Sequence, residues 1–488
     1  MPMKLFNTLG REIQEFKPIH EKTVGFYGCG PTVYNFAHIG NLRAYVTHDL
    51  LVRALRHAGY QVTHVMNITD VGHLTGDADT GEDKMVKSAE ERGKSVLEIA
   101  NFYTDAFFKD TERLNILRPT IVCKATEHIQ DMIELIQRIE ARGYTYRAGG
   151  NLYFDITRFP NYGELAQLKL DDLKAGARID VDQNKRNPFD FALWFTKSKF
   201  ENQALTWDSP WGRGYPGWHI ECSAMSMKYL GEQFDIHAGG IDHIPIHHTN
   251  EIAQSEAATG KKWVNYWVHN EFLVLDKGKM SKSSGSFLTL QSLIDAGYDA
   301  LDYRYFLMGG HYRSQLQFSY PAMEGARNAR KALLDRLRFL VEKAGTIPAG
   351  SDLAQQGVQV SRVEPGTKAA GYRDAFFKAI EDDLNTPRAI AELWGLLKDT
   401  DVQPLEALKV VFEMDEVLGL DLRTQISAQS EKTKLSPEQI AAIETRIAER
   451  TTAKKNRDFA RADAIRAELK AQGILLEDTP AGTTWRLL

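Results

Sequence analysis

Apolar and polar positions near the N-terminus alternate in a way that predicts strands and helices in turn. The apolar run TVGFYGC at 23–29 is typical of a short buried strand. Apolar residues then recur at helical spacing over 41–60, and a second strand-like run, QVTHVMNIT, occupies 61–69. This β-α-β order predicts an α/β fold with a parallel, doubly wound sheet.

The pattern breaks after residue 71 and returns near residue 218. Between them lie two long helical periodicities, roughly 84–115 and 125–142, a hairpin-like GYTYRAGGNLYFD and a loop rich in lysine and aspartate. We interpret about 72–190 as an insertion that splits the sheet domain. From 288 onward the pattern is helical.

Polar stretches predict the domain boundaries. A polar segment with glycine and proline covers 345–368, and a second polar segment covers 421–435. Ser436, Pro437 and Gln439 then form the N-terminal signature of a helix, a capping box with proline at the first position. We expect an α/β domain over 1–330, in which 271–330 forms a distinct region, then a helical bundle over 331–425 and a small C-terminal domain over 426–488.

Composition narrows the classes of protein. A chain of 488 residues is too long for one core. The net charge of −5 gives no overall basic signal for nucleic acid, so any RNA-binding surface has to be local. Neither a signal peptide nor an apolar stretch of about 18 residues stands out. Three cysteines do not suggest a disulfide framework, and we expect a cytoplasmic protein.

Two segments have the chemistry of phosphate sites. In CGPTVYNFAHIGN (29–41) a strand leads into a helix N-terminus, whose free N–H groups suit an anion, and His38 and Gly40 lie at that turn. The alternative is an ordinary turn capped by His38. In LDKGKMSKSSGS (275–286), Lys279 and Lys282 lie among serines and glycines that could surround an oxyanion, although a solvated basic turn has the same composition.

These two segments together resemble the signature of class I aminoacyl-tRNA synthetases. Residues 38–41, HIGN, resemble the HIGH element with Asn41 in place of its last histidine, and 279–283 match KMSKS in full. The resemblance implies a Rossmann-like catalytic domain in which ATP and an amino acid condense to an aminoacyl-adenylate. The substrate carboxylate is the nucleophile, so the protein supplies position and positive charge.

The same resemblance assigns roles to single residues. It places His38 and Asn41 at the reacting phosphate, and Lys282, assisted by Lys279, at the leaving pyrophosphate. Asp242 is expected to meet the ATP ribose or the substrate ammonium group. The implied ATP-binding set, with Mg²⁺ accompanying ATP, is His38, Gly40, Asn41, Gly239, Gly240, Asp242, Lys279, Ser281 and Lys282.

Scarce cysteines and a histidine pair suggest a metal site. Cys29 ends the first strand, Cys222 lies at the start of a helix, and IPIHHTNEIAQS carries two histidines and Glu251. His247 and Glu251 share a helix face at i,i+4, as His248 and Glu251 do at i,i+3, so spacing does not choose between the histidines. Two thiolates, an imidazole and a carboxylate would suit tetrahedral zinc. The alternative is that the cysteines are simply buried.

Four segments together resemble cysteinyl-tRNA synthetase: GCGPTVYNFAHIGN, GWHIECSAM, FDIHAGGID and HHTNEIAQS. That family binds one zinc at the floor of the amino-acid pocket, and the resemblance implies that its ligands here are Cys29, Cys222, His247 and Glu251. Zinc prefers a thiolate to an alcohol, so it would separate cysteine from serine without an editing site. The family also lines the cysteine pocket with residues at the positions of Thr69, Trp218, His237 and Asp242. Cys123 matches no ligand position.

The C-terminal segment carries the expected contacts with tRNA. Residues 446–470 hold eight basic and four acidic side chains, a local charge of +4. Arg461, and Trp485 next to Arg486, could contact unpaired anticodon bases. Trp485 could equally close a small local core. The family uses this terminal domain for the anticodon, which favours the tRNA assignment at the level of the domain.

The resemblance thus implies a cysteine–tRNA ligase that acts on L-cysteine, ATP and tRNA(Cys), and by analogy a monomer without membrane contact. A cysteine:amino-sugar ligase of the same fold is the nearest alternative, but it would lack the segment 435–488. A simple nucleotidyltransferase would need only the HIGN turn. A non-enzymatic zinc- or RNA-binding protein would show no exchange of pyrophosphate into ATP.

Overall fold

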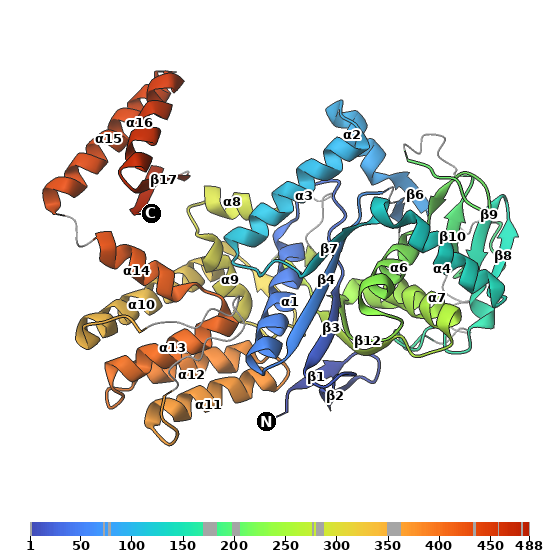
Figure 1. Ribbon diagram of the computed structural model, residues 1–488, viewed down its shortest axis with the longest axis horizontal. Helices are drawn as coiled ribbons and strands as arrows, with labels where there is room; N and C mark the ends of the chain where they lie inside the picture. The colour runs from blue at the N-terminus through green and yellow to red at the C-terminus, as the bar shows by residue number, and fades with distance from the viewer. Residues whose placement is uncertain are drawn as a thin grey trace.

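A five-stranded parallel sheet forms the centre of the computed structural model, which describes residues 2–71, 74–76, 80–168, 183–197, 205–275, 278–279, 287–348, 363–432, 436–456, 458–479 and 482–487. Its order is β13-β12-β3-β4-β7 (Figure 1). The strands are β3 (Thr23–Gly28), β4 (Gln61–Ile68), β7 (Ile121–Lys124), β12 (Phe234–Gly240) and β13 (Val264–Asn270). Along the chain, β4 and then β7 follow on one side of β3, and β12 and then β13 follow on its other side. The predicted doubly wound sheet is confirmed, and its order reverses between β3 and β12, where ligands bind in such folds.

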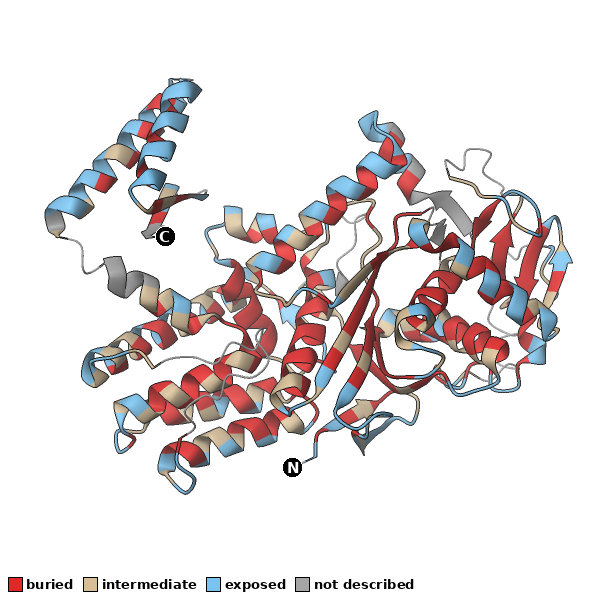
Figure 2. Cartoon of the chain, viewed as in Figure 1, coloured by how far each residue is buried: buried red, intermediate tan, exposed pale blue. Residues whose placement is uncertain are grey.

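Helices cover both faces of this sheet. α1 (Ile39–His57) connects β3 to β4, and α2 (Lys84–Arg92) and α3 (Val96–Arg113) lie between β4 and β7. Helices α4 (Ile129–Ala141), α6 (Trp218–Leu230) and α7 (Thr249–Thr259) form a second core with the sheet, separate from the core on the α1 side. Figure 2 shows the central strands mostly buried between these layers, apart from the edge strand β7, in which only Cys123 is buried.

A second, antiparallel sheet lies beside the first. Its order is β11-β10-β9-β8, from β8 (Thr145–Ala148), β9 (Asn151–Phe154), β10 (Phe191–Phe195) and β11 (Tyr215–Pro216). A short hairpin of β5 (Leu74–Gly76) and β6 (Thr80–Asp83) precedes α2. The prediction of one insertion over about 72–190 is therefore wrong in its middle and at its C-terminal end. β7 lies inside that range but belongs to the central sheet, whereas β10 and β11 lie beyond it.

Helices dominate the chain after the sheet domain. The first part contains β14 (Leu273–Leu275), β15 (Gly278–Lys279), α8 (Leu290–Asp295), α9 (Ala300–Met308) and β16 (Leu316–Phe318). The bundle follows with α10 (Tyr320–Ala344), α11 (Lys368–Glu381), α12 (Thr386–Lys398), α13 (Pro404–Leu418) and α14 (Leu422–Lys432). The boundary predicted at 330/331 falls inside α10, and the bundle shares one core with α1 and the sheet.

A buried ion cluster fixes the bundle to the sheet domain. Asp49 of α1 accepts hydrogen bonds from Arg53 at 2.8 Å and from Arg304 of α9 at 2.5 Å. Arg304 also donates to the carbonyl oxygens of Leu114, which follows α3, and Leu418, which ends α13. All three charged side chains are buried, so this junction joins α1, α3, α9 and α13.

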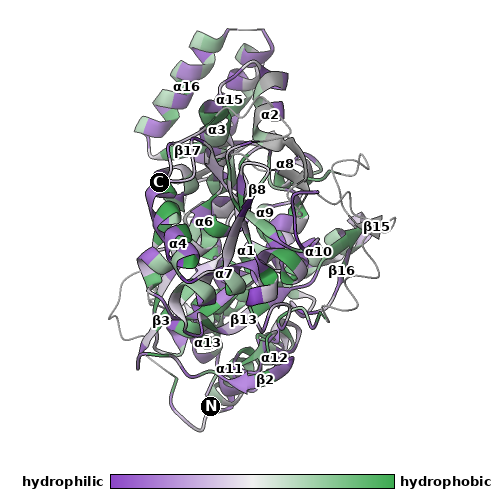
Figure 3. Ribbon diagram, turned by 90° about the vertical axis from the view of Figure 1, so that its right-hand side faces the viewer, coloured by the Kyte–Doolittle hydropathy of each residue, from purple (hydrophilic) through white to green (hydrophobic). Residues whose placement is uncertain are grey.

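The C-terminal unit is two helices and a hairpin. α15 (Pro437–Lys455) begins at the predicted capping box, in which Ser436 and Gln439 bond reciprocally at 2.8 and 3.2 Å. It packs on α16 (Phe459–Ala471) and on the hairpin of β17 (Ile474–Thr479) and β18 (Gly482–Leu487). Figure 3 shows hydrophilic and hydrophobic residues interleaved along α15 and α16, as expected of helices with one buried face.

In the part of the chain that the structure describes, no helix combines the length and the apolar character needed to span a membrane.

Candidate functional site

The HIGN turn follows the end of β3 and opens α1. Nδ1 of His38 accepts the N–H of Asn41 at 2.9 Å, and the Asn41 side chain accepts the N–H of His38 at 3.2 Å. Because Nδ1 accepts, a neutral His38 ring carries its hydrogen on Nε2 and can donate it to an anion. A Cβ at Gly40 would lie 3.1 Å from the His38 ring, so glycine gives that ring its room. Capping and phosphate binding are therefore compatible roles for His38.

The HIGN turn contacts the chain that flanks the KMSKS sequence. The N–H of Ile39 donates to the carbonyl of Leu288 at 2.8 Å, and His38 forms a β-bridge with Thr289. Lys279 ends β15, where it pairs with Val274. The sequence from Met280 to Ser286 lies outside the described residues, so the roles of Ser281 and Lys282 stay predictions.

The four residues implied as metal ligands converge in the structure. Cys29 follows β3, Cys222 lies in α6, His247 in the π-helical turn Ile244–His248 (η4), and Glu251 in α7. Each offers one ligand atom within 4.8 Å of all the others, and all four residues are buried. Two sulfurs, one imidazole nitrogen and one carboxylate oxygen at this spacing fit tetrahedral zinc.

Polar contacts around Glu251 position the candidate ligands. Oε1 of the buried Glu251 lies 2.7 Å from Nε2 of His247, the distance of a close ion pair. Oε2 of Glu251 meets Nε2 of His237 at 2.8 Å, and Nδ1 of His247 meets Nδ1 of His219 at 2.9 Å. These outer contacts orient the ligands.

An overlapping set of ligands includes the other histidine. Cys29, His237, His248 and Glu251 also place their ligand atoms within 4.8 Å of one another, and Nε2 of His248 lies 3.3 Å from Sγ of Cys29. Both adjacent histidines thus reach the site, as their spacing allowed. Only the set with His247 contains both cysteines, and thiolates are the ligands that favour zinc.

The charges of the cluster are coupled. Burial alone lowers the pKa of His247, but Glu251 and Cys222 outweigh it and raise that pKa to about 10. Burial likewise acts to raise the pKa of Glu251, yet His247 and His237 lower it to about 2. A hydrogen bond with Cys29 lowers the pKa of the Cys222 thiol to about 6, while burial raises the pKa of Cys29 well above its ordinary value. Without a metal, a protonated His247 thus neutralises the anionic Cys222 and Glu251, and a metal ion bound by these ligands would displace that proton.

Trp218 and His237, which were expected to line the cysteine pocket, contact this cluster, and Thr69 contacts Glu221, next to Cys222 in sequence. The ring of Trp218 stacks on that of His247 with 4.2 Å between centroids. Thr69 is buried; its hydroxyl accepts from Asn67 at 3.1 Å and donates to Glu221 at 3.0 Å. His237 is fully buried and bonds Glu251, so in this conformation it supports a candidate ligand.

Glu221 is a residue of this site that sequence reasoning missed. It is fully buried, its Oε1 accepts no hydrogen bond, and burial raises its pKa well above the ordinary value. Its position directly before Cys222 could have indicated it, because an acidic side chain on a buried helix face needs a hydrogen-bond partner. Glu221 connects the Cys222 helix to Thr69.

The residues assigned to adenosine lie at the carboxyl end of β12, next to β3. Gly239 is essential there, because a Cβ would stand 2.8 Å from the rings of both His243 and His248. Gly240 ends the strand, and Asp242 follows in a short 3₁₀ turn with its side chain exposed. This is the point where the sheet order reverses, so the HIGN turn, the cysteine cluster and Asp242 share one edge of the sheet.

Cys123 and the proposed tRNA residues lie elsewhere. Cys123 is buried in β7 and belongs to neither ligand set. Trp485 is 6% exposed, belongs to the core of the C-terminal unit and donates to Glu444 at 2.7 Å. The expectation that it stacks on an anticodon base is therefore wrong, and the alternative of a core residue holds. Arg461 is exposed on α16, 3.9 Å from Glu449.

Comparison with known proteins identifies relatives of this chain over its full length. Residues 15–328 match the family described as tRNA synthetases class I (C) catalytic domain. Cysteine–tRNA ligases of Treponema denticola and Treponema pallidum are 61% and 47% identical over 100% of both chains, and that of Borrelia hermsii is 43% identical over 99% of both. A structure of Mycobacterium tuberculosis methionyl-tRNA synthetase with methionyl-adenylate shares the fold, with a TM-score of 0.54 and 16% identity over 86% of this chain and 96% of that chain. The chain belongs to the cysteine–tRNA ligase family of class I tRNA synthetases.

Proposed function

We propose that this chain activates L-cysteine with ATP and transfers it to the 3′ end of tRNA(Cys). In the first step a carboxylate oxygen of cysteine attacks the α-phosphorus of ATP and pyrophosphate leaves. In the second step a 3′-terminal ribose hydroxyl of the tRNA attacks the carbonyl carbon and AMP leaves. The observation that carries the proposal is the buried cluster of Cys29, Cys222, His247 and Glu251 next to the HIGN turn.

The HIGN turn supplies the phosphate side of the reaction. The N-terminus of α1 directs N–H groups and partial positive charge toward an anion. His38 donates from Nε2, because its Nδ1 caps the helix. The backbone N–H of Asn41 holds that ring by donating to its Nδ1, and Lys279 and Lys282 neutralise the leaving pyrophosphate, which Mg²⁺ accompanies.

The cysteine cluster supplies the specificity. A zinc ion held by Cys29, Cys222, His247 and Glu251 would bond directly to the substrate sulfur, which a serine hydroxyl cannot match. Trp218 covers the ring of His247, and Asp242 faces the ammonium group or the ribose. Thr69 keeps a fixed hydroxyl direction because it donates to Glu221.

The C-terminal unit supports tRNA as the acceptor. An amino-sugar ligase would not need α15, α16 and their hairpin, which form a separate small core. Arg461 lies exposed on this unit and is the tRNA contact that we propose at the level of single residues. By analogy with the family, the chain acts as a monomer.

Two assays test the function. Cysteine-dependent exchange of pyrophosphate into ATP tests activation, and transfer of labelled cysteine to tRNA(Cys) or to an amino-sugar tests the acceptor. We expect exchange with cysteine and transfer to tRNA only. Arg461→Ala should weaken transfer and leave exchange unchanged. Transfer to the sugar, or no exchange, would contradict the proposal.

A further inference from the structure

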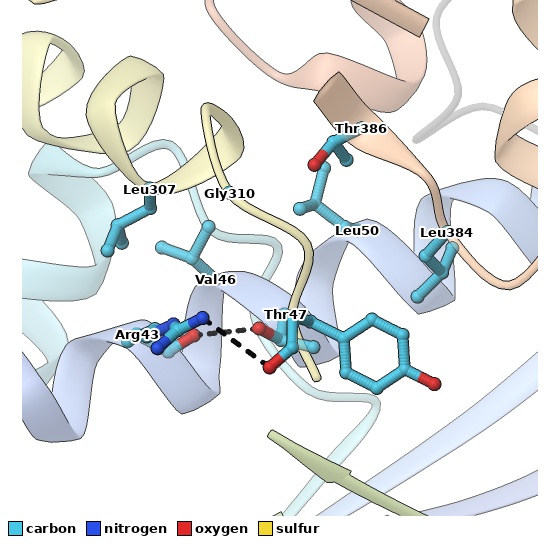
Figure 4. A pocket seen from close by; sticks show the side chains of 9 residues that line it. Arg43, Val46, Thr47, Leu50, Leu307, Gly310, Leu384 and Thr386 are labelled. Atoms are coloured by element: carbon cyan, nitrogen blue, oxygen red, sulfur yellow. Dashed lines mark hydrogen bonds between the residues drawn. The ribbon is translucent and has the colours of Figure 1, made fainter. Parts of the chain in front are cut away.

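Arg43 lies in the first turns of α1, two residues after Asn41, and its side chain is buried. The residue is 2% exposed. Its guanidinium donates to the carbonyl oxygens of Phe272 at 2.5 Å and Ser314 at 2.6 Å, and at longer range to those of His311 and Tyr312, at 3.2 and 3.4 Å. Figure 4 shows this side chain beside Thr47 and Val46, facing the chain near Gly310.

This environment is unusual for a buried arginine. Among the described residues no carboxylate forms an ion pair with Arg43, and burial lowers the pKa of its guanidinium. Backbone carbonyls are its direct hydrogen-bond partners, with Tyr303 and Glu271 acting at longer range, and a planar fork of five donors can reach several carbonyls at once. Lysine has the same charge but cannot reproduce this geometry.

The acceptors of Arg43 belong to the chain that leads into the KMSKS sequence. Phe272 directly precedes β14, and β14 pairs with β15, where Val274 lies opposite Lys279. The carbonyl of Phe272 also accepts the N–H of Leu316 at 3.1 Å, so the same point fixes β16 against β14. Arg43 therefore bonds the residue that directly precedes β14, the strand before the KMSKS sequence.

The chain that leaves the KMSKS sequence meets the same turn of α1. Leu288 accepts the N–H of Ile39 at 2.8 Å, and Thr289 bridges His38. The first turns of α1 thus contact both flanks of the segment 273–287, one through Arg43 and the other through Ile39. The cavity beside Arg43 measures about 10 Å³, the size of one water molecule, so it does not hold a substrate.

We propose that Arg43 is a positioning residue that aligns the two flanks of the KMSKS sequence with the HIGN turn. This inference rests on the proposed function. Because Arg43 is 2% exposed and its donors bond backbone carbonyls, its proposed role is to place other groups rather than to bind substrate. A displacement of about 1 Å between such groups can cost about 10²-fold in rate.

The test compares Arg43→Lys with Arg53→Lys. Arg53 is a matched control: it lies on the same helix, is buried, and donates to the carbonyls of Asn115 and Glu416, but far from the HIGN turn. Pyrophosphate exchange gives kcat and the KM for cysteine and for ATP, and thermal unfolding gives Tm. All rates are measured below the lowest Tm.

We expect Arg43→Lys to lower kcat by about 10- to 100-fold, with the KM for cysteine within about twofold of the wild-type value. Arg53→Lys should lower Tm but keep kcat within about twofold. Equal losses of kcat in both variants, or a KM for cysteine that rises as far as kcat falls, would overturn the role of Arg43. Wild-type protein without cysteine-dependent exchange would instead overturn the proposed function on which it rests.

Discussion

The junction between α1, α9 and the bundle allows a quantitative prediction for Asp49→Asn. The Asp49 carboxylate is fully buried between two guanidinium groups, and its other oxygen accepts the N–H of Leu117 at 2.8 Å. Burial alone raises the pKa of Asp49, but Arg53 and Arg304 outweigh it and lower that pKa below its ordinary value, so the group is ionised at neutral pH. Asparagine leaves two buried cations without their anion.

The expected loss follows from that burial. Removal of one partner from a buried ion cluster costs about 3–5 kcal/mol of unfolding free energy. A surface pair offers the control: Asp335 and Arg338 lie 2.5 Å apart on α10, but their side chains are 56% and 35% exposed. Asp335→Asn should cost less than about 1 kcal/mol, because solvent screens such a pair.

Urea unfolding followed by tryptophan fluorescence measures both variants. Six of the eight tryptophans lie before residue 270, so the signal reports the sheet domain. Arg304→Met and the double variant complete the cycle and isolate the coupling between Asp49 and Arg304. A loss below about 1 kcal/mol for Asp49→Asn, or coupling no larger than that of the surface pair, would refute the reasoning.

Three further predictions concern the C-terminal unit and the metal. Trp485→Ala should lower the unfolding free energy of the C-terminal unit by about 3–5 kcal/mol, because the indole fills its core; unchanged hydrogen exchange over 437–487 would contradict this. A hydrogen bond with Arg450 lowers the pKa of Asp478, so its stabilisation is present above the ordinary aspartate pKa of about 3.9 and is lost as the pH falls. Asp478→Asn should therefore reduce the fall in the Tm of this unit between neutral and acid pH. An unchanged dependence of Tm on pH would show that the Arg450–Asp478 pair does not stabilise the unit. Chelation of bound zinc should lower the Tm of the wild-type protein but not of Cys222→Ser; an equal shift in both would contradict the assigned ligands.

The central α/β rhythm could be predicted from the sequence because each strand is a short apolar run next to a long helical periodicity. The strand β7 was missed, since its four residues, IVCK, are too few to show a period. The antiparallel sheet extends past the predicted insertion because β10 pairs with β9 across a stretch that no local pattern connects. The boundary at 330/331 failed for a related reason: α10 is a single amphipathic helix whose face packs on both regions.

Several features of the site could not be predicted from local sequence patterns. Sequence spacing did not distinguish His247 from His248 as the ligand next to Glu251. In the structure the π-helical turn before α7 places both rings at the cluster. Glu221 escaped notice because its partner, Thr69, is 152 residues away. Trp485 looked exposed near the chain end, but the hairpin of β17 and β18 turns it onto α15. Contacts of this range depend on the topology, which the residues near each position do not reveal.

Pyrophosphate exchange with cysteine against serine tests most directly whether a metal selects the substrate thiol. The assay uses protein of known zinc content, before and after chelation, with Cys222→Ser as the ligand variant and Cys123→Ser as the matched control. We predict one zinc per chain and exchange with cysteine only, both lost in Cys222→Ser and retained in Cys123→Ser. Exchange that persists without zinc, or that accepts serine nearly as well as cysteine, would contradict the account and leave Cys29 and Cys222 as packing residues.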